Sequence, residues 1–341
     1  MESKMMAHHV KTLLLISVCV LLASCGGQKA KQNEGITFVD PPRREGTEAV
    51  LVMLPANSAS AEVRQGLLES VGEEYDIVTR VVGGKVTADD INTAMTEVSP
   101  AAVVLLNNAT IKAYKAWQKT QGDDKEFPPA MLLMASYLKE FAGDVQAATG
   151  IVYEIPSVSI FSNLRKLVKH EVKRVGVLHR PNLKTFIEGQ QKLAAIEKFE
   201  LVAVEMPADP DAREVRRAVR RLSKEVDALW VLNDNGLLTS KMLTKAWVPG
   251  LRRNTLPVVV GVKALVAEQA VLGTFAVLPD HMEMGLQAGN MLLEIADEDW
   301  TTEGGFEQPI AVKTVMHVGF ARDHLGLIED RKDRINVLVG Q

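Results

Sequence analysis

The feature that most constrains this chain is an alternation of short apolar runs and amphipathic stretches, which the sequence runs through twice. In the first cycle, Ala49 to Leu54 is a continuous apolar run, as a strand buried on both faces of a parallel sheet requires. The stretch after it places Val63, Leu67 and Val71 four residues apart, which predicts a helix. The first cycle predicts strands at 49–54, 76–82, 102–106 and 130–134, and helices at 59–72, 88–98 and 109–119.

A seam at 149–182 separates the two cycles. It predicts a strand at 150–153 and a helix at 158–170. The second cycle predicts strands at 174–178, 200–206, 228–232 and 257–260, helices at 183–198 and 211–224, and another helix that ends near residue 246. A further strand and a long helix are expected within 268–295, then a late strand at 310–318 and a closing turn at 321–327.

Strands that alternate with helices form a parallel sheet with right-handed crossovers. We therefore expect an α/β fold of two doubly wound parallel-sheet lobes with an interlobe cleft. The chain has 341 residues, 47% of them apolar, which is enough for two buried cores. The expected divisions are a signal peptide at 1–24, a flexible tether at 25–46, an N-terminal lobe at 47–156, a C-terminal lobe at 157–280 and a return segment at 281–341 that crosses between the lobes.

The N-terminus has the layout of a secretion signal. Lys4 and Lys11 precede an apolar run at 13–22, which is too short to span a bilayer as a stable helix. The run leads into Leu22-Ala23-Ser24-Cys25, which resembles a bacterial lipobox, whose cysteine is diacylated and becomes the first residue of the mature chain. An ordinary signal peptide with a chance cysteine is the alternative. We expect lipidation of Cys25 and a location in the cell envelope, anchored on the periplasmic side of the inner or outer membrane.

Cysteine content and charge exclude several classes of function. Cys19 lies within the expected signal, so Cys25 would be the only cysteine of the mature chain. That leaves no internal disulfide, no cysteine metal site and no cysteine nucleophile. The net charge of −4 is far from the strongly basic character of nucleic-acid-binding proteins, so we expect no nucleic-acid partner.

Polar residues follow the strands of both cycles at matching positions. The third strand of each cycle closes on Leu-Asn, which places Asn107 and Asn108 in one cycle and Asn233 and Asp234 in the other. Ligands of open α/β sheets bind beyond the carboxyl ends of strands, so these side chains are expected at a binding site. An amide both donates and accepts, whereas an ionised carboxylate only accepts, which makes an ammonium or a ring N–H the natural partner of Asp234. The candidate ligand-binding residues are Asn57, Ser58, Asn107, Asn108, Ser136, His179, Asn182, Asn233, Asp234 and Asp280.

Two other interpretations of polar and charged residues remain open. Asn and Asp favour turns and helix N-caps for local reasons, so capping is the alternative role for the asparagines and Asp234. A basic stripe follows the predicted helix 211–224, opposite its apolar face, and is read either as a solvated outer face or as a docking surface for a partner. It consists of Arg213, Arg216, Arg217, Arg220 and Arg221.

The usual catalytic signatures are absent from the sequence. The stretch 83–87 lacks the upstream glycine and the adjacent hydroxyl of a phosphate loop and is read as a turn. There is no dinucleotide fingerprint and no nucleophile elbow. The histidines beyond the signal show no metal-ligand spacing, and surface or structural roles are expected for all of them except His179. We expect no enzymatic activity, no metal and no cofactor.

Several short stretches share their order and spacing with one known family. They are Thr149-Gly150-Ile151, Pro156, Leu164, Leu167, Lys173 to Leu178, Val226 to Leu229, Asn233-Asp234-Asn235, Gly273, Asp280, Gly285, Ala288, Ala321 and Leu325-Gly326-Leu327. Together they resemble the tryptophan/tyrosine-type substrate-binding proteins of ABC importers, over essentially the whole expected mature chain. The resemblance implies a class I periplasmic-binding-protein fold, a small-molecule ligand in the interlobe cleft and an ABC permease as partner. The loops 55–58 and 179–183 depart from the family pattern, so an aromatic amino acid is not implied as the ligand.

We interpret the chain as a lipid-anchored, monomeric solute-binding protein that captures a small polar, amino-acid-like ligand for an ABC importer. One alternative keeps the fold but makes the chain an envelope lipoprotein that binds or regulates another protein. A two-domain glycosyltransferase is a third reading, which the absent nucleotide loop disfavours.

Replacing Cys25 with serine is expected to abolish lipid attachment. Two acyl chains give the stable membrane anchoring that a single chain does not. Metabolic labelling with a palmitate analogue measures attachment directly, and label that persists in Cys25→Ser would show that the anchor is not at this residue.

Overall fold

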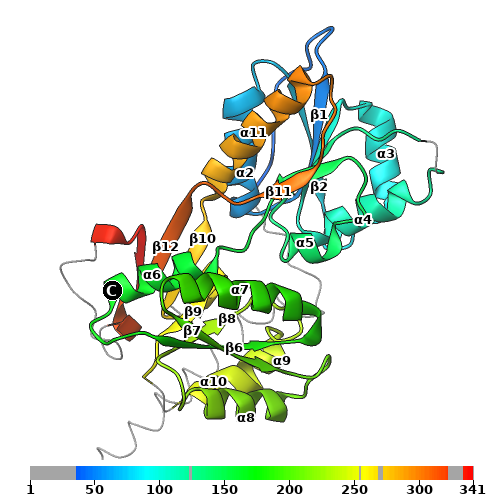
Figure 1. Cartoon of the computed structure of the whole chain (residues 1–341). Helices are drawn as coiled ribbons and strands as arrows, with labels where there is room; N and C mark the ends of the chain where they lie inside the picture. Colours follow the sequence, from blue (N-terminus) through cyan, green and yellow to red (C-terminus); the bar gives the residue numbers. More distant parts are fainter. Residues whose placement is uncertain (1–35, 123–124, 253–254, 268–271, 322–332, 341) are drawn as a thin grey trace, which may run out of the picture. The chain divides into compact units, whose positions relative to one another are not determined.

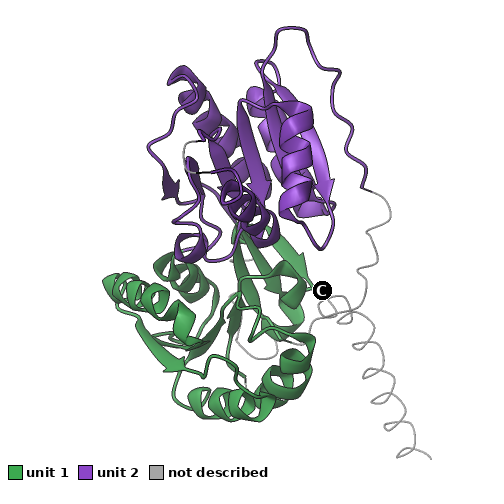
Figure 2. Cartoon of the chain, turned by 90° about the vertical axis from the view of Figure 1, so that its right-hand side faces the viewer, with its two compact units in different colours: residues 1–31, 156–278, 313–341 green, residues 32–155, 279–312 purple. Residues whose placement is uncertain are grey.

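The computed structural model describes residues 36–122, 125–252, 255–267, 272–321 and 333–340. The expected signal peptide, Cys25 and residues 322–327 of the closing turn lie outside these ranges. The described chain divides into two compact units (Figure 2). Unit 2 takes 36–155 and 279–312, and unit 1 takes 156–278 and 313–340. The chain therefore passes from one unit to the other three times.

Unit 2 is built on a six-stranded sheet in the order β11-β5-β4-β3-β1-β2, in which every neighbouring pair is parallel. Apolar side chains of the three central strands are buried on both faces, as their continuous apolar runs require. The strands are β1 (Ala49–Pro55), β2 (Asp76–Val82), β3 (Ala102–Leu106), β4 (Ala130–Leu133), β5 (Ala148–Ile151) and β11 (Gly305–Glu307).

Helices cover both faces of this sheet. On one face, α3 (Ala88–Val98) and α4 (Asn108–Gln118) bury their apolar sides, including Tyr114 and Trp117, and the short α5 (Leu138–Phe141) joins them. On the other face, α2 (Ser58–Val71) and α11 (His281–Asp297) enclose the second core. Both helices start at the carboxyl edge of the sheet, where ligands of α/β proteins bind.

Glycines bring α2 and α11 into backbone contact. Figure 1 shows α11 lying along α2, although more than 200 residues separate them in the sequence. A β-carbon built on Gly66 would lie 2.2 Å from the carbonyl oxygen of Met282, and one on Gly285 would lie 2.1 Å from that of Val63. No side chain fits at either position, so the two glycines set the separation of the helices.

Residues that precede β1 are fastened to the outer side of β2. The carboxylate of Asp40 accepts from the backbone N–H of Thr79 at 2.7 Å and from the Arg64 guanidinium at 2.8 Å. Arg44 pairs with Asp76 at the start of the same strand, at 2.9 Å. Burial raises the pKa of Asp40, but the hydrogen bonds from Thr79 and Arg64 outweigh burial and leave that pKa lowered. Part of the segment assigned to the tether thus covers an exposed sheet edge.

Unit 1 is built on a seven-stranded, mostly parallel sheet in the order β13-β12-β10-β9-β8-β6-β7. Helices α6 (Ser157–Leu167) and α7 (Lys184–Ile196) lie on one face and α8 (Ala212–Leu222) and α10 (Val248–Leu251) on the other (Figure 1). The strands are β6 (Arg174–His179), β7 (Glu200–Glu205), β8 (Ala228–Val231), β9 (Val258–Val260), β10 (Phe275–Pro279), β12 (Val312–His317) and β13 (Val337–Val339).

The fold class expected from the sequence is confirmed: each unit is an α/β sheet with helices on both faces, all parallel in unit 2 and mostly parallel in unit 1. The seam strand begins at Ala148, two residues before its predicted start, and the helix that follows Asn235 begins only at Ser240. That helix is composite, because α9 (Ser240–Met242) and α10 flank a π-helical turn, η3 (Leu243–Trp247). Strands β11 and β13 were not predicted, although the equally short β9 was.

Replacing Gly285 with alanine is expected to destabilise the protein by about 1–3 kcal/mol, because the added methyl group overpacks the contact with α2. Alanine at Gly189, on α7, is the matched control, since a β-carbon there would meet nothing within 4 Å. That change should stabilise the helix by about 0.5–1 kcal/mol through its better helix propensity. Urea denaturation measures both, and equal stabilisation by the two alanines would contradict the close contact.

Candidate functional site

Asn107 follows β3 in a strained backbone conformation. Its φ of 77° and ψ of 161° belong to a region that is essentially restricted to glycine. The side chain compensates by capping α4, since its Oδ1 accepts from the N–H groups of Ala109 at 2.8 Å and Thr110 at 3.0 Å. The structure therefore shows Asn107 as an N-cap, and its ligand-binding role remains a prediction.

Asn108 ties together the loops that follow β3 and β4. Its amide donates to the carbonyl of Ser136 at 2.9 Å and accepts from the N–H of the same residue at 3.0 Å. Met134 and Tyr137, on either side of Ser136, have positive φ angles of 53° and 56°. These two candidate residues are thus in direct contact, and three strained residues gather at one edge of the sheet, as is common at binding sites.

The remaining candidates of unit 2 lie at helix N-termini. Asn57 caps α2 by accepting from the N–H of Ser60 at 2.9 Å, and Ser58, the first residue of the helix, is exposed. Asp280 caps α11 by accepting from the N–H of Met282 at 3.1 Å. Capping accounts for two of these three side chains, whereas Ser58 has no capping role.

Glu154, which the sequence analysis did not select, lies just beyond β5. Its carboxylate accepts from the N–H of Tyr137 at 2.9 Å, and no arginine or lysine among the described residues forms an ion pair with it. Burial raises the pKa of Glu154 to about 7, and the nearby Glu140 also raises it. A carboxyl group so placed would gain from a positively charged neighbour.

Tyr153 and His281 form a second polar group at this edge. The Tyr153 hydroxyl and His281 Nε2 are 3.0 Å apart, and His281 Nδ1 lies 3.6 Å from a carboxylate oxygen of Glu62 on α2. Burial, together with the charges of Glu154 and Glu62, raises the pKa of Tyr153 to about 12, so the hydroxyl stays protonated. A surface or structural role was expected for His281, and the structure shows that it links the segment after β5 to α2 and α11.

In unit 1, Asp234 is bound by an arginine of the neighbouring loop. The Arg180 guanidinium donates to both carboxylate oxygens, from Nε at 2.8 Å and 3.0 Å and from Nη2 at 2.6 Å. The Asp234 side chain is 1% exposed and that of Arg180 26%. Gly236 makes room for the pair, because a β-carbon there would lie 2.5 Å from the guanidinium carbon. The cation predicted for Asp234 is thus already supplied by the protein.

Other candidates of unit 1 surround this pair. His179 is buried at the end of β6, and its Nδ1 lies 3.1 Å from the Arg180 carbonyl. Asn233 donates from its amide to Gly261 at 3.2 Å, while its buried Oδ1 has no hydrogen-bond partner among the described residues. Asn182 is exposed in a short 3-10 turn, η2 (Pro181–Leu183).

Arg180 is the main residue that sequence reasoning missed. It lies between two candidates, His179 and Asn182, and it reaches Asp234 because β6 and β8 are neighbours in the sheet. The signal was present in the sequence: an arginine after one strand and an aspartate after an adjacent one are expected to pair. Glu154 had no such signal, since its burial depends on the loop after β4.

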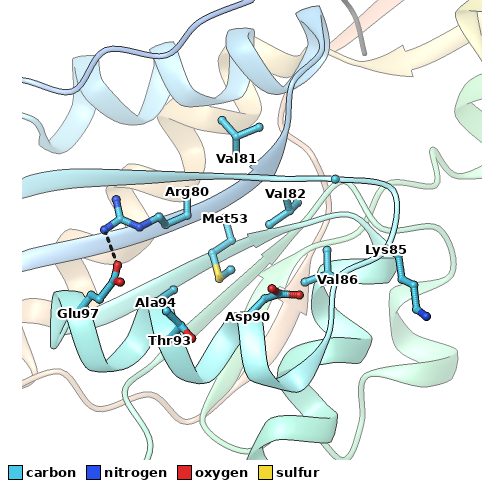
Figure 3. Close-up of a pocket in the computed structure, with 11 residues that line it drawn as sticks. Met53, Arg80, Val81, Val82, Lys85, Val86, Asp90, Thr93, Ala94 and Glu97 are labelled. Atoms are coloured by element: carbon cyan, nitrogen blue, oxygen red, sulfur yellow. Dashed lines mark hydrogen bonds and ion pairs between the residues drawn. The ribbon is translucent and has the colours of Figure 1, made fainter. Parts of the chain in front are cut away.

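A pocket of about 310 Å³ lies away from these residues, between β2 and α3 (Figure 3). Met53, Val82 and Ala94 contribute apolar walls. Of its charged residues, Arg80 binds Glu97 at 3.2 Å and Asp90 closes the capping box of α3, whereas Lys85 forms no ion pair among the described residues. No candidate residue lines this pocket, so it does not belong to the site.

The described residues contain neither a metal-binding cluster nor a membrane-spanning helix. No group of three or more His, Cys, Asp or Glu side chains in these ranges is arranged to hold a metal ion. No helix within them has the length and apolar character needed to cross a bilayer.

Comparisons with known proteins add information at the level of the fold. No protein-family model and no curated protein matches the chain. Among solved structures, a ligand-free, open substrate-binding protein with adhesive properties from Clostridium difficile is 14% identical, with a TM-score of 0.64 over 86% of this chain and 100% of its own. An ABC domain from Streptococcus pneumoniae in complex with L-Trp is 16% identical, with a TM-score of 0.56 and the same coverage. A conserved domain protein from Vibrio cholerae is 16% identical, with a TM-score of 0.57 over 86% of this chain and 99% of its own.

At these identities the similarity shows the fold alone. The chain has the fold of class I periplasmic substrate-binding proteins, with a parallel α/β sheet in each of two units. The ligands that those proteins bind are not attributed to this chain. A proposal for its ligand rests on the residues of its own loops.

Glu154→Gln is expected to stabilise the ligand-free protein near pH 8 and to have little effect near pH 4. The folded-state pKa of about 7 lies above the ordinary value of 4.5, so stability falls as the pH rises between these values. Glutamine keeps the acceptor for Tyr137 and removes the charge. Thermal melting across this range measures the effect, with Glu188→Gln on the exposed side of α7 as control. A variant that melts below wild type near pH 8 would contradict the buried-carboxyl description.

Proposed function

We propose that this chain is a solute-binding protein that captures a small polar solute and delivers it to an ABC-type permease, while Cys25 anchors it to a membrane of the cell envelope. The observation that carries the proposal is the repeated placement of polar side chains directly after strands. Asn107 and Asn108 follow β3, and Asn233 and Asp234 follow β8. Parallel α/β sheets bind ligands at this edge.

The chemistry of the two edges supports binding without reaction. Arg180 and Asp234 neutralise each other, and the caps on α2, α4 and α11 are occupied, so the loops are fixed before any ligand arrives. Preorganised loops avoid the ordering cost of binding. No nucleophile activated by a base is found among the described site residues, and we propose that the chain has no enzymatic activity.

An amino-acid-like solute fits the groups available. Glu154 offers a carboxylate without a basic partner in the described chain, which suits an ammonium group. The L-Trp bound by the Streptococcus pneumoniae protein belongs to the same class of ligand.

Native mass spectrometry of freshly purified protein tests for a retained solute, and thermal shift with amino acids, sugars and polyamines tests for added ones. A bound solute should raise the melting temperature by mass action. If nothing is retained and no compound in the panel shifts the melting temperature, the solute-binding proposal fails.

Variants at two neighbouring residues, Ser58 and Asn57, distinguish a role in solute binding from a role in helix capping. Ser58→Ala is expected to weaken binding of the solute about 3- to 10-fold, the effect of one lost hydrogen bond, and to leave melting without ligand unchanged. Asn57→Ala should do the reverse: it removes the cap of α2 and costs about 1 kcal/mol of stability with affinity nearly unchanged. Calorimetric titration and thermal melting measure the two effects. Unchanged affinity in Ser58→Ala would remove this residue from the site.

A further inference from the structure

The outer face of α8 is rich in arginine. The helix carries five arginines and no lysine, and it buries only Val215, Val219 and Leu222. No arginine of α8 forms an ion pair within the described residues, although Glu214 lies on the same helix. Its arginines are Arg213, Arg216, Arg217, Arg220 and Arg221, of which all but Arg216 are exposed.

Neighbouring elements extend this face. Helix α10 and the π-helical turn η3 pack beside α8, and Figure 1 shows α8 and α10 on the same side of the sheet. Residues 240–252 contain three basic residues, Lys241, Lys245 and Arg252, all exposed, and no acidic one. Arg220 donates to the carbonyl of Pro249 at 3.3 Å, which joins the two parts. We call this surface, the arginines of α8 with Lys241, Lys245 and Arg252, the α8 face.

The α8 face lacks the features of a protein-binding surface. Protein interfaces depend on apolar or aromatic anchors at their centre. The large apolar side chains that are exposed in the described chain are Val39, Val81, Ile196 and Ile310, and none belongs to this face. Trp247, the aromatic residue of η3, is buried, with its indole N–H bonded to the Leu237 carbonyl at 2.9 Å. Charge without an apolar centre favours a partner that is recognised by charge alone.

We propose that the α8 face docks on the anionic phospholipid surface of the membrane. Guanidinium groups match phosphate oxygens by two parallel hydrogen bonds, a geometry that lysine cannot provide. Each basic residue near an anionic membrane strengthens binding about five-fold, so weak contacts accumulate over the face. The proposal draws on the expected lipid anchor at Cys25, because an anchored chain meets the surface at high effective concentration.

Vesicle binding tests the docking apart from the anchor. The chain that starts at Gly26 keeps every described residue, and it is mixed with vesicles of phosphatidylcholine, with or without phosphatidylglycerol, and sedimented. We expect binding only where phosphatidylglycerol is present, and binding that weakens as salt is raised. Binding that does not depend on lipid charge, or no binding at all, overturns the proposal; in the second case an acidic protein becomes the partner to seek.

A pair of matched variants assigns the binding to the α8 face. R217Q/R220Q/R221Q should lower the partition coefficient about 100-fold, since each arginine accounts for about a factor of five. K169Q/K184Q/K192Q removes the same net charge from exposed positions of unit 1 along and next to α6 and α7, and it should bind nearly as wild type. Equal losses in the two variants would mean that net charge, and not this face, is responsible. Thermal melting confirms that both variants fold.

Discussion

Unit 2 depends on the backbone contact between α2 and α11. Gly66 and Gly285 allow the two helices to approach until a single methyl group would collide with a carbonyl oxygen. That approach lets α11 seal the core formed by β1, β3 and β4, with Met284, Ala288 and Leu292 fully enclosed. The N-termini of both helices, and with them the residues Ser58 and His281, are positioned at the carboxyl edge by the same contact. Packing and site geometry therefore share one cause.

The carboxylates near the sheet edges differ in whether the protein itself neutralises their charge. Asp234 is bound on both oxygens by Arg180, and such a pair fixes a loop more than it attracts a ligand. The carboxylate of Glu154 is not paired with a cation among the described residues. It accepts from one backbone N–H, and burial disfavours its charged form. Among the groups described, the unsatisfied ones have the most to gain from a bound solute.

Periodicity was enough to predict the two parallel sheets. Continuous apolar runs such as 102–106 admit little other than a strand buried on both faces, and the ends of that strand are as predicted. Strands β11 and β13 were missed. The first has one apolar residue, Phe306, and pairs with β5 far earlier in the chain, and the second follows the closing turn, beyond which no element was predicted. For the site, the sequence located the loops after β3 and β8 but could not distinguish a cap from a ligand contact. That difference rests on angles such as the positive φ of Asn107, which no residue type specifies by itself.

The make-up of unit 2 from two separate stretches has a consequence for how the protein folds. Five of its six strands and α2 precede residue 155, yet α11, which covers one face of the sheet together with α2, comes only at 281–297, and the edge strand β11 follows it. Until those residues are available, the apolar side of α2 and of the central strands lies uncovered. Contacts between segments so far apart in sequence form slowly, and exposed apolar surface during that interval favours aggregation. Unit 2 is thus begun first and completed late, after most of unit 1 has been synthesised.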